Sequence, residues 1–473
     1  MRFTRIVATI GPVTSSPEKI LELAKMGVGI CRMNFSHGDH EFHKKTIEAV
    51  RSVNKKGYSM GIMLDTKGPE VRTGDVTTPL PIEKDDLVAF TPKALTGSEK
   101  MKTVRVNYEL FARDAKHARC IVIDNGAIEM KVVRIERDVV IAKSLEGGKI
   151  GSRRHVNLPG AYISLPSFTE KDWKDIKFGI EQDVDFYATS FVRTGSDIDE
   201  LRSFLKKHKS EAHIIAKIET PQAVENIDDI IASSDGIMVA RGDLGSEVPF
   251  EDVPKIQDDI VRKCRKAGKP VIVATHMLES MILNPTPTRA EVTDIAYAAR
   301  SQADSTMLSG ETAGGTYPLK SVMAMDKVLR CNERVEPTYD LLADEAKTGK
   351  VNIDMPRREQ ALSASVLATK LHADALVVIS KHGRTARAVS NCRPLVPIHT
   401  FTDNEACQRR MMLLWGVIPH VVKFSANSEK TADAALSLLQ KKELLKKGQR
   451  VVVVSDILGP GNARVMSIQI RTM

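Results

Sequence analysis

Eight short runs rich in Val and Ile recur through the first two thirds of the chain, and this recurrence constrains the fold more than any other feature. The runs are RIVATI (5–10), VGICRMN (28–34), SMGIMLD (59–65), VDFYATSF (184–191), HIIAKIE (213–219), DGIMVAR (235–241), PVIVATH (270–276) and DSTMLSG (304–310). Most are followed by a stretch with apolar residues at spacings of three and four, such as EDVPKIQDDIVRKCRKAG, which predicts a helix. Eight β/α units in series predict a (β/α)8 TIM barrel of the α/β class.

The series is interrupted once, between the third and fourth runs. Residues 70–167 contain short β-like runs instead, namely LVAF, TVRV, CIVIDNGAIEM, VVRI and DVVIAK. A segment of this size forms a domain, and we predict an inserted, β-rich, β-barrel-like one. Because it leaves the barrel at the end of a strand, it lies over the face where barrel active sites form. This position favours a lid function. The alternative is an inserted domain with no role in catalysis.

A third series begins after about residue 340, where the chain turns polar. Its predicted strands are ALVVIS (375–380), VPIHTFT (396–402), IPHVVKF (418–424), RVVVVSD (450–456) and SIQIR (467–471). A chain of 473 residues exceeds the size at which single cores stop growing, so several domains are expected. We predict a barrel of residues 1–69 and 168–342, an insert of 70–167 and a C-terminal α/β domain of 343–473.

The composition is that of a globular protein. No apolar run approaches the roughly 18 residues needed to cross a bilayer, so we expect no membrane role. The first residues, MRFTRIVATIGP, read as a strand rather than as a signal peptide. The six cysteines include no C-x-x-C pair and no histidine at metal spacing, which signals neither a zinc site nor a disulfide framework. We therefore expect a cytoplasmic protein.

The formal charge of +9 does not by itself indicate nucleic-acid binding. Lys and Arg are interleaved with Asp and Glu, and no basic tract with aromatic residues occurs. We expect small anionic ligands and no nucleic acid.

Polar residues gather where the predicted strands end, at the edge where barrel enzymes bind substrates. The groups are residues 32–37, 65–70, Ser190, 217–219, 240–243, Thr275 and 309–312.

Lys217 and Glu219 point the same way, because strand side chains alternate between faces. Glu219 and Asp243 follow neighbouring strands and can ligate one hard cation, while Lys217 can reach a phosphoryl oxygen. The set indicates phosphoryl transfer. The alternative for Lys217 and Glu219 is a purely structural ion pair. The Arg241-Gly242-Asp243 turn can likewise be only a tight turn at the end of the strand. Gly242 also allows a ligand carboxylate to approach backbone amides, which favours a binding site.

At these residues the sequence resembles the pyruvate kinase family over essentially the whole chain. The similar segments are TRIVATIGP, CRMNFSHG, LDTKGPEVRTG, VNLPG, AKIETPQA, SDGIMVARGDLG, ATHMLESM, PTPTRAEVTD and MLSGETAGGTYP, all in the family's order. Each motif alone is weak, whereas nine in order are specific. The resemblance implies transfer of the phosphoryl group of phosphoenolpyruvate to ADP, giving pyruvate and ATP.

The resemblance also implies a metal set. Glu219 and Asp243 would bind Mg²⁺ (or Mn²⁺), and Lys217 would offset charge on the transferring group. The K⁺ ligands would be Asn34, Ser36, Asp65 and the Thr66 carbonyl, a set of hard oxygens. Glu70 supports potassium dependence, because relatives that dispense with the ion tend to carry lysine there.

Further roles follow from the same resemblance. Lys217, Gly242, Asp243 and Thr275 would bind the substrate. Nucleotide and phosphoryl groups would be held by Arg32, Asn34, His37, Arg72 and Lys171, of which Arg72 and Lys171 flank the lid. For Arg32, His37, Arg72 and Lys171 the alternative is a solvated surface charge. Arg32, Lys217, Thr275 and Ser309 would be catalytic, with Ser309 and Thr275 as candidates for relaying a proton to the enolate carbon through water.

In the last domain, residues Ser380, Lys381, His382, Gly383, Arg384 and Thr385 follow a predicted strand and precede the helix start ARAV. Hydroxyls and backbone amides at a helix N-terminus form a phosphate cradle, with an ordinary turn as the alternative. In the family this loop receives a phosphorylated allosteric effector, helped here by Leu458-Gly459-Pro460-Gly461. Fructose 1,6-bisphosphate, a sugar monophosphate and AMP all remain open.

The family generally forms homotetramers, which implies one here. Two departures are visible: His276 stands where many relatives have Gln, and Ala223 where many have Gly. Both positions vary in the family, so neither threatens the reaction.

Two other functions are compatible with parts of the sequence. A magnesium-dependent aldolase or carboxylase on a related barrel explains Glu219 and Asp243 but leaves the lid, Lys171 and the potassium set without a purpose. A catalytically silent sensor conflicts with the intact Arg32, Lys217 and Thr275. An assay for ATP formed from phosphoenolpyruvate and ADP separates these functions.

Overall fold

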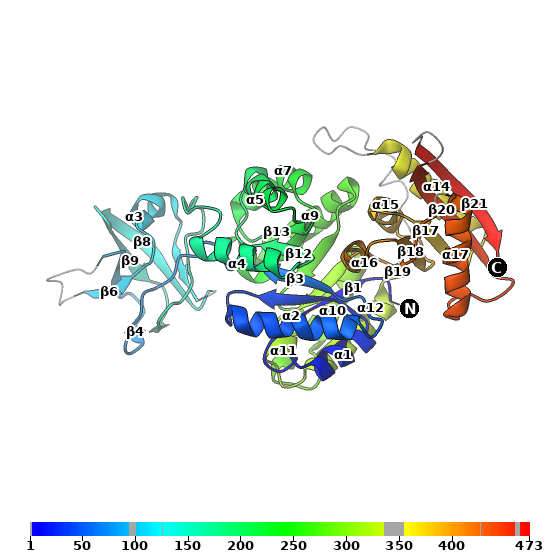
Figure 1. The fold of residues 1–473 in the computed structure, drawn as a ribbon. Helices are drawn as coiled ribbons and strands as arrows, with labels where there is room; N and C mark the ends of the chain where they lie inside the picture. The colour runs from blue at the N-terminus through cyan, green and yellow to red at the C-terminus, as the bar shows by residue number, and fades with distance from the viewer. Residues whose placement is uncertain (1, 94–100, 125, 335–353, 426, 459–463) are drawn as a thin grey trace.

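The eight predicted runs form one closed parallel barrel. The computed structural model describes residues 2–93, 101–124, 126–334, 354–425, 427–458 and 464–473 (Figure 1). The barrel strands are β1 (Arg5–Thr9), β2 (Val28–Asn34), β3 (Gly61–Asp65), β12 (Phe186–Thr189), β13 (His213–Ile218), β14 (Gly236–Ala240), β15 (Val271–Ala274) and β16 (Ser305–Leu308). Their order around the barrel is β1-β16-β15-β14-β13-β12-β3-β2. The predicted (β/α)8 TIM barrel is therefore confirmed.

The helices of the barrel cover its outer face. They are α1 (Pro17–Lys25), α2 (His40–Asn54), α4 (Glu170–Glu181), α5 (Gly195–Lys207), α6 (Pro221–Glu225), α7 (Ile227–Ser233), α8 (Arg241–Glu247), α9 (Val253–Ala267), α10 (Arg289–Arg300), α11 (Gly310–Ala313) and α12 (Pro318–Asn332). Their starts follow local chemistry, since Thr169 and Thr288 form capping boxes with Asp172 and Glu291. Gly268, at φ 65°, ends α9 in the left-handed conformation that glycine adopts without strain.

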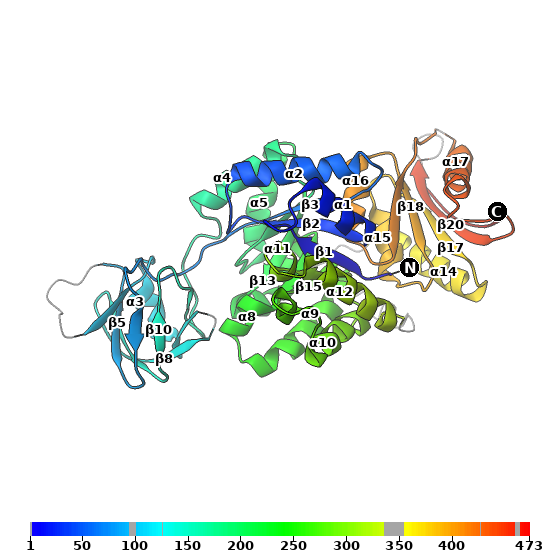
Figure 2. The same cartoon turned by 90° about the horizontal axis from the view of Figure 1, so that it is seen from below.

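The insert folds around a core of its own. Its elements are β4 (Leu80–Ile82), β5 (Leu87–Thr91), β6 (Lys102–Arg105), α3 (Phe111–Asp114), β7 (Ile121–Ile123), β8 (Ile128–Glu136), β9 (Val139–Ser144), β10 (Gly148–Ile150) and β11 (Val156–Asn157). A six-stranded sheet in the order β11-β7-β8-β9-β5-β6 lies beside the pair β10-β4. Val88, Phe90, Phe111, Ile121 and Met130 pack inside. Figures 1 and 2 show this body standing off one end of the barrel.

The last domain is a second α/β unit. It contains α14 (Met355–Lys370), β17 (Ala375–Ile379), α15 (Arg384–Asn391), β18 (Ile398–Thr402), α16 (Glu405–Met411), β19 (Val417–Val421), α17 (Ser428–Lys441), β20 (Arg450–Leu458) and β21 (Arg464–Thr472). The sheet order is β19-β18-β17-β20-β21, with β21 antiparallel to β20. The expected boundary at residue 343 lies outside the described residues. No helix in the described ranges has the length and apolar character needed to span a bilayer.

The two outer bodies attach to the barrel in different ways. Leu413 of the last domain joins the apolar cluster inside the barrel, and its carbonyl accepts a 3.2 Å hydrogen bond from Ser305 at the start of β16. Phe3 stacks on Trp415 with ring centroids 4.6 Å apart. The insert is attached at the other end through polar groups. Arg193, for example, donates 2.6 Å hydrogen bonds to the carbonyls of residues 163 and 165.

Candidate active site

A buried lysine lies at the centre of the carboxyl ends of the barrel strands. Lys217 Nζ, near the end of β13, donates to Ser190 Oγ at 2.6 Å. It also lies 2.8 Å from Glu219 Oε1 and 3.1 Å from Asp65 Oδ1. Burial lowers the pKa of Lys217, but Asp65, Glu219 and Asp243 together raise it above its ordinary value. The ammonium therefore stays charged in a site that excludes water.

Glu219 is fully buried and only partly satisfied. Its Oε2 accepts a 2.6 Å hydrogen bond from the backbone N–H of Phe191. Its Oε1 lies close to Lys217 but receives no well-aligned hydrogen bond within the described residues. Burial raises the pKa of Glu219; Lys217 opposes this rise, and the charge of Asp243 adds to it. A buried carboxylate whose charge is further destabilised by a second carboxylate is an arrangement that a hard cation relieves.

Arg32 and Asp65 form the second buried ion pair of the site. Arg32 Nε lies 2.6 Å from Asp65 Oδ2, and its Nη1 donates to Thr9 Oγ1 at 2.9 Å. Burial acts against the charged form of Asp65, yet Arg32 and Lys217 hold its pKa below the ordinary value. Arg32, Asp65 and Lys217 therefore form one continuous charged network across β2, β3 and β13.

The oxygens predicted as potassium ligands lie on adjoining strand ends. Asn34 is the register partner of Asp65, and its Oδ1 accepts a 3.1 Å hydrogen bond from the Ser36 N–H. The Thr66 carbonyl accepts a 2.7 Å hydrogen bond from Ser190 Oγ. The side chain of Ser190 thus links this group of oxygens to Lys217.

Thr275 follows β15 in a conformation that β-branched residues rarely adopt. Its φ is 67°, and that of His276 is 53°. Thr275 Oγ1 accepts a 2.7 Å hydrogen bond from the Gly242 N–H and donates to the Ala274 carbonyl at 2.6 Å. Arg241 secures the turn by donating to the Thr275 carbonyl at 2.6 Å. Strain held in place by such bonds is typical of functional sites.

Four of the predicted residues line one cavity of about 510 Å³ at the ends of β1, β2 and β16: Arg32, Asn34, His37 and Ser309. Ser309 Oγ is buried and has no hydrogen-bond partner within the described residues. Its backbone N–H donates to Glu311 Oε2 at 2.6 Å, while Glu311 Oε1 accepts from the Leu278 N–H at 3.0 Å. Glu311 thus fixes the loop that presents Ser309 to the cavity.

Arg72 and Lys171 stand at the base of the insert. Lys171 Nζ reaches the Phe35 carbonyl at 2.8 Å, which brings it beside residues 34–37. Arg72 instead binds Glu70 at 2.6 Å and donates to the Arg153 carbonyl at 2.7 Å. Glu70 is thus paired with Arg72 in this conformation, and Arg72 is held within the insert.

The helix that follows β17 begins earlier than the sequence predicts. Arg384 and Thr385 already belong to α15, which starts two residues before ARAV, because Gly383 at φ 72° caps it. Ser380 Oγ accepts a 3.2 Å hydrogen bond from the Thr385 N–H. Lys381 and His382 are exposed. Gly459, Pro460 and Gly461, expected to assist this loop, lie outside the described residues.

Three residues that the geometry brings into the site were noted in the sequence only as polar groups at strand ends, without an assigned role: Ser190, Arg241 and Glu311. Ser190 and Arg241 stand at strand ends, where position alone marks them, and Glu311 lies two residues after Ser309. Their contacts include backbone carbonyls and amides, such as the Thr66 carbonyl for Ser190 and the Leu278 N–H for Glu311, and such contacts leave no trace in residue spacing. No group of three His, Cys, Asp or Glu side chains suited to a metal occurs in the part of the chain that the structure describes.

Comparison with known proteins gives matches along nearly the entire chain. The family model "Pyruvate kinase, barrel domain" matches residues 1–322, and "Pyruvate kinase, alpha/beta domain" matches residues 359–469. Pyruvate kinase isozyme G, chloroplastic, of Nicotiana tabacum is 43% identical over 96% of this chain and 80% of its own length. The pyruvate kinase of Dictyostelium discoideum is 39% identical over 99% of this chain and 94% of its own.

A solved structure agrees with these relatives. The crystal structure of a pyruvate kinase from Cryptosporidium parvum superposes with a TM-score of 0.91 at 34% identity, covering 99% of this chain and 96% of that one. Because the two models divide the chain between them and these relatives span nearly all of it, this chain belongs to the pyruvate kinase family and is a phosphotransferase.

Proposed function

We propose that this chain transfers the phosphoryl group of phosphoenolpyruvate to ADP at the carboxyl ends of the barrel strands, giving pyruvate and ATP. The observation that carries the proposal is the position of Lys217, whose Nζ lies within 3.1 Å of both Asp65 and Glu219. A charged donor preorganised in a buried site stabilises negative charge that develops on a migrating phosphoryl group.

A divalent cation fits the carboxylates beside Lys217. Pyruvate kinases generally require such a cation together with potassium. Glu219 Oε1 is buried without an aligned hydrogen bond in the described residues, and Asp243 acts on the same carboxylate through its charge. Glu219 and Asp243 would hold Mg²⁺ or Mn²⁺, which when bound neutralises phosphoryl oxygens.

Potassium is assigned to the oxygens of Asn34, Ser36, Asp65 and the Thr66 carbonyl. Support comes from their proximity at the ends of β2 and β3 and from the hardness of their oxygens. Asp65 also anchors Arg32 and Lys217, so its loss would disturb more than ion binding.

The substrate would lie between Lys217 and the turn at the start of α8. Gly242 and Thr275 are joined by a 2.7 Å hydrogen bond, so an entering carboxylate would compete with the threonine hydroxyl for that amide. Asp243 belongs to the same turn. Thr275, held at φ 67°, presents its hydroxyl to this region and is one candidate for relaying a proton to the enolate carbon.

Ser309 is the other candidate for the proton relay. Its hydroxyl is buried, lines the 510 Å³ cavity and lacks a partner within the described residues, so it is available to a water or a substrate oxygen. The same cavity offers Arg32, Asn34 and His37 to the nucleotide and the phosphoryl groups. Arg72 and Lys171 would join them when the insert closes as a lid.

The remaining assignments concern regulation and assembly. Ser380 to Thr385 would receive a phosphorylated effector, supported by the Gly383 cap and the exposure of Lys381 and His382. We further propose a homotetramer, a cytoplasmic location, and domain boundaries at residues 69/70, 167/168 and 342/343. Two similar proteins from Nicotiana tabacum and Arabidopsis thaliana carry the word chloroplastic in their names, so location needs its own test by imaging of a tagged chain.

The decisive experiment measures ATP formation from phosphoenolpyruvate and ADP with Mg²⁺ and K⁺ added together, singly and not at all. We expect turnover only when a divalent cation is present, with strong stimulation by K⁺. Glu219→Gln should raise the Mg²⁺ concentration needed for half-maximal rate at least about tenfold, because one charged ligand is lost. No ATP with both cations supplied would refute the proposed reaction.

A further inference from the structure

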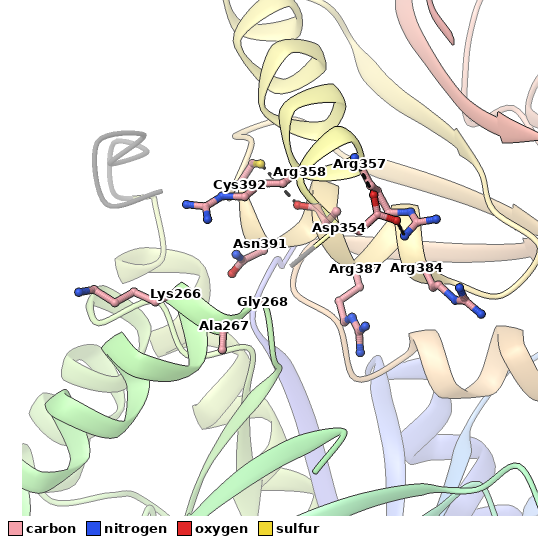
Figure 3. A pocket seen from close by; sticks show the side chains of 11 residues that line it. Lys266, Ala267, Gly268, Asp354, Arg357, Arg358, Arg384, Arg387, Asn391 and Cys392 are labelled. Carbon is pink, nitrogen blue, oxygen red and sulfur yellow. Dashed lines mark hydrogen bonds and ion pairs between the residues drawn. The ribbon is translucent and has the colours of Figure 1, made fainter. Parts of the chain in front are cut away.

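The barrel meets its two outer bodies through junctions of different kinds. At the junction with the last domain, a cavity of about 440 Å³ separates the end of α9 from α14 and α15, and the arginine side chains that line it point in different directions (Figure 3). At the other junction, Figure 2 shows α8 at the end of the barrel that faces the insert. There the strand segment around β11 lies against the barrel, and individual side chains make the contact. Each of these side chains therefore restrains the insert directly.

Asn157 is a buried polar residue to which the reaction assigns no role. It belongs to the segment VNLPG, ends β11 and is 2% exposed. Its Nδ2 donates a hydrogen bond to Glu247 Oε1 on the barrel, whereas its Oδ1 is shielded from solvent and has no partner in the described residues. A buried amide that is only half satisfied costs stability, so packing alone does not account for an asparagine here.

Glu247, the last residue of α8, is the barrel side of this contact. Burial raises the pKa of Glu247 to about 7; the hydrogen bond from Asn157 opposes this rise, and the charge of Asp243 adds to it. The carboxylate is therefore partly removed from water where it meets the insert. A hydrogen bond to an ionised acceptor in such surroundings is stronger than one between neutral groups.

The helix α8 gives Glu247 a fixed position on the barrel. Arg241, at the start of the helix, donates to the Thr275 carbonyl at 2.6 Å and to the Ala274 carbonyl at 3.2 Å. Its Nη1 also lies 2.6 Å from Asp294 Oδ1. None of these contacts involves the insert, so α8 offers the insert a stationary point of attachment.

The same part of the insert carries Arg72. Arg72 forms an antiparallel bridge with His155, two residues before Asn157. The His155 ring packs edge-on to Phe191 of the barrel, with ring centroids 5.9 Å apart. Asn157 and His155 thus fix this edge of the insert to the barrel at two points, and the place of Arg72 relative to the active site follows from theirs.

We propose that Asn157 and Glu247 are a positioning pair, which holds the insert on α8 so that Arg72 meets the phosphoryl groups of the nucleotide. This role rests on the proposed binding of the nucleotide by Arg72. Neither side chain of the pair is assigned to substrate, metal or reacting atoms, so both act through Arg72. Because Arg241 holds the substrate turn independently, the pair should affect the use of ADP more than that of phosphoenolpyruvate.

The test removes the contact from each side and measures steady-state rates at about pH 8, where Glu247 is ionised. Asn157→Leu nearly keeps the volume of the amide, and Glu247→Met nearly keeps the length of the acidic side chain. In both variants we expect kcat/KM for ADP to fall at least about tenfold, with KM for phosphoenolpyruvate within about twofold of the parent's, because one charge-assisted contact is lost. Equal losses for the two substrates would show a general structural role and overturn the proposal.

A conservative variant and a double variant show whether the two residues act as one unit. Glu247→Gln retains an acceptor for Asn157 Nδ2 and should keep kcat/KM for ADP within about threefold of the parent's. Asn157→Leu/Glu247→Met should lose no more than either single variant, because both changes remove the same contact. Multiplied losses in the double variant would contradict the pairing. Glu109→Met, which changes an exposed carboxylate of the insert, is the matched control and should keep parental kinetics.

Hydrogen exchange separates a failure of this pair from a failure of the proposed reaction. Amides of residues 71–73 and 154–157 should exchange at least about ten times faster in Asn157→Leu and in Glu247→Met, because the insert is freed from α8. Glu247→Met changes no residue of the insert, so faster exchange there reports the lost contact rather than a folding defect. A parent chain that makes no ATP would refute the reaction, whereas parental exchange rates in both variants would overturn the pair.

Discussion

At the scale of single residues, the site depends on Lys217 being charged, dry and fixed. Three groups fix it: Ser190 accepts its hydrogen bond, and Asp65 and Glu219 flank it. Spacing in the sequence was enough to select Lys217 and Glu219, because alternation along a strand places them on one face. Residue spacing does not reveal the role of Ser190, which follows another strand. Its hydroxyl accepts a hydrogen bond from Lys217 and donates one to the Thr66 carbonyl.

Replacing Lys217 by Met should lower kcat at least about a hundredfold, since one preorganised donor supplies on the order of 2.7 to 4 kcal/mol to a transition state. Steady-state rates at saturating phosphoenolpyruvate and ADP measure this. Binding of the substrate should weaken less than turnover falls, because the added charge appears in the transition state.

Lys143→Met, which changes an exposed side chain of β9 in the insert, is the matched control and should keep parental kinetics. Circular dichroism must show that Lys217→Met is folded, because the change leaves the buried Glu219 without its cation and Asp65 with Arg32 alone. A folded Lys217→Met variant with kcat within tenfold of the parent would contradict the role assigned to this ammonium.

At the scale of elements, the predicted ends of the barrel strands differ from the observed ends by about two residues or fewer. Runs of β-branched residues bounded by polar groups are local signals, so the sequence alone reveals them. The start of α15 was placed two residues late, since the cap is a glycine backbone conformation rather than a capping side chain. The pairing within the insert was beyond prediction: β5 pairs with both β6 and β9, and short strands carry no mark of their partners.

Hydrogen bonds from the Arg193 side chain attach the insert to the barrel. The guanidinium donates to the carbonyls of residues 163 and 165 and to Ser167 Oγ at 3.1 Å. Arg193→Met removes these bonds, each worth roughly 0.5 to 3 kcal/mol. We expect amides of residues 158–168 to exchange with solvent on the order of ten to a hundred times faster.

Hydrogen exchange detected by mass spectrometry measures this change. The amides of β13 are the internal reference, and their exchange rates should not change. Arg134→Met, in an exposed pair with Glu136 on β8, removes an arginine of the same insert and should leave residues 158–168 unaffected. Equal exchange rates for residues 158–168 in the parent and in Arg193→Met would show that the Arg193 hydrogen bonds do not hold this segment.

At the scale of the whole molecule, the barrel and the last domain share buried contacts at the end remote from the active site. Asp185, at the start of β12, accepts from the Ile62 N–H at 2.9 Å and from Arg409 Nε of α16 at 2.9 Å. Burial raises the pKa of Asp185 from 3.8 to about 6, although Arg409 opposes the rise. The junction therefore carries a carboxyl group that titrates at mildly acidic pH.

This raised pKa predicts a pH dependence of stability. Between about pH 4 and pH 6 the folded chain binds the proton of Asp185 more tightly than the unfolded chain does, so this group's contribution decreases as pH rises. The decrease amounts to about 3 kcal/mol, at about 1.36 kcal/mol per pKa unit. Urea unfolding at a series of pH values should show this slope in the parent and lack it in Asp185→Asn. Parallel curves for the two proteins would contradict it.

The polar attachment of the insert predicts that the viscosity of the solvent affects turnover. The insert rests on polar groups, whereas Leu413 and Trp415 fix the last domain to the barrel with apolar contacts. The proposed lid function would make each nucleotide that enters or leaves wait for the insert to move through water. Turnover should slow in step with the viscosity imposed by sucrose or glycerol, while a large polymer that raises the bulk viscosity but is excluded from the protein surface should leave it unchanged.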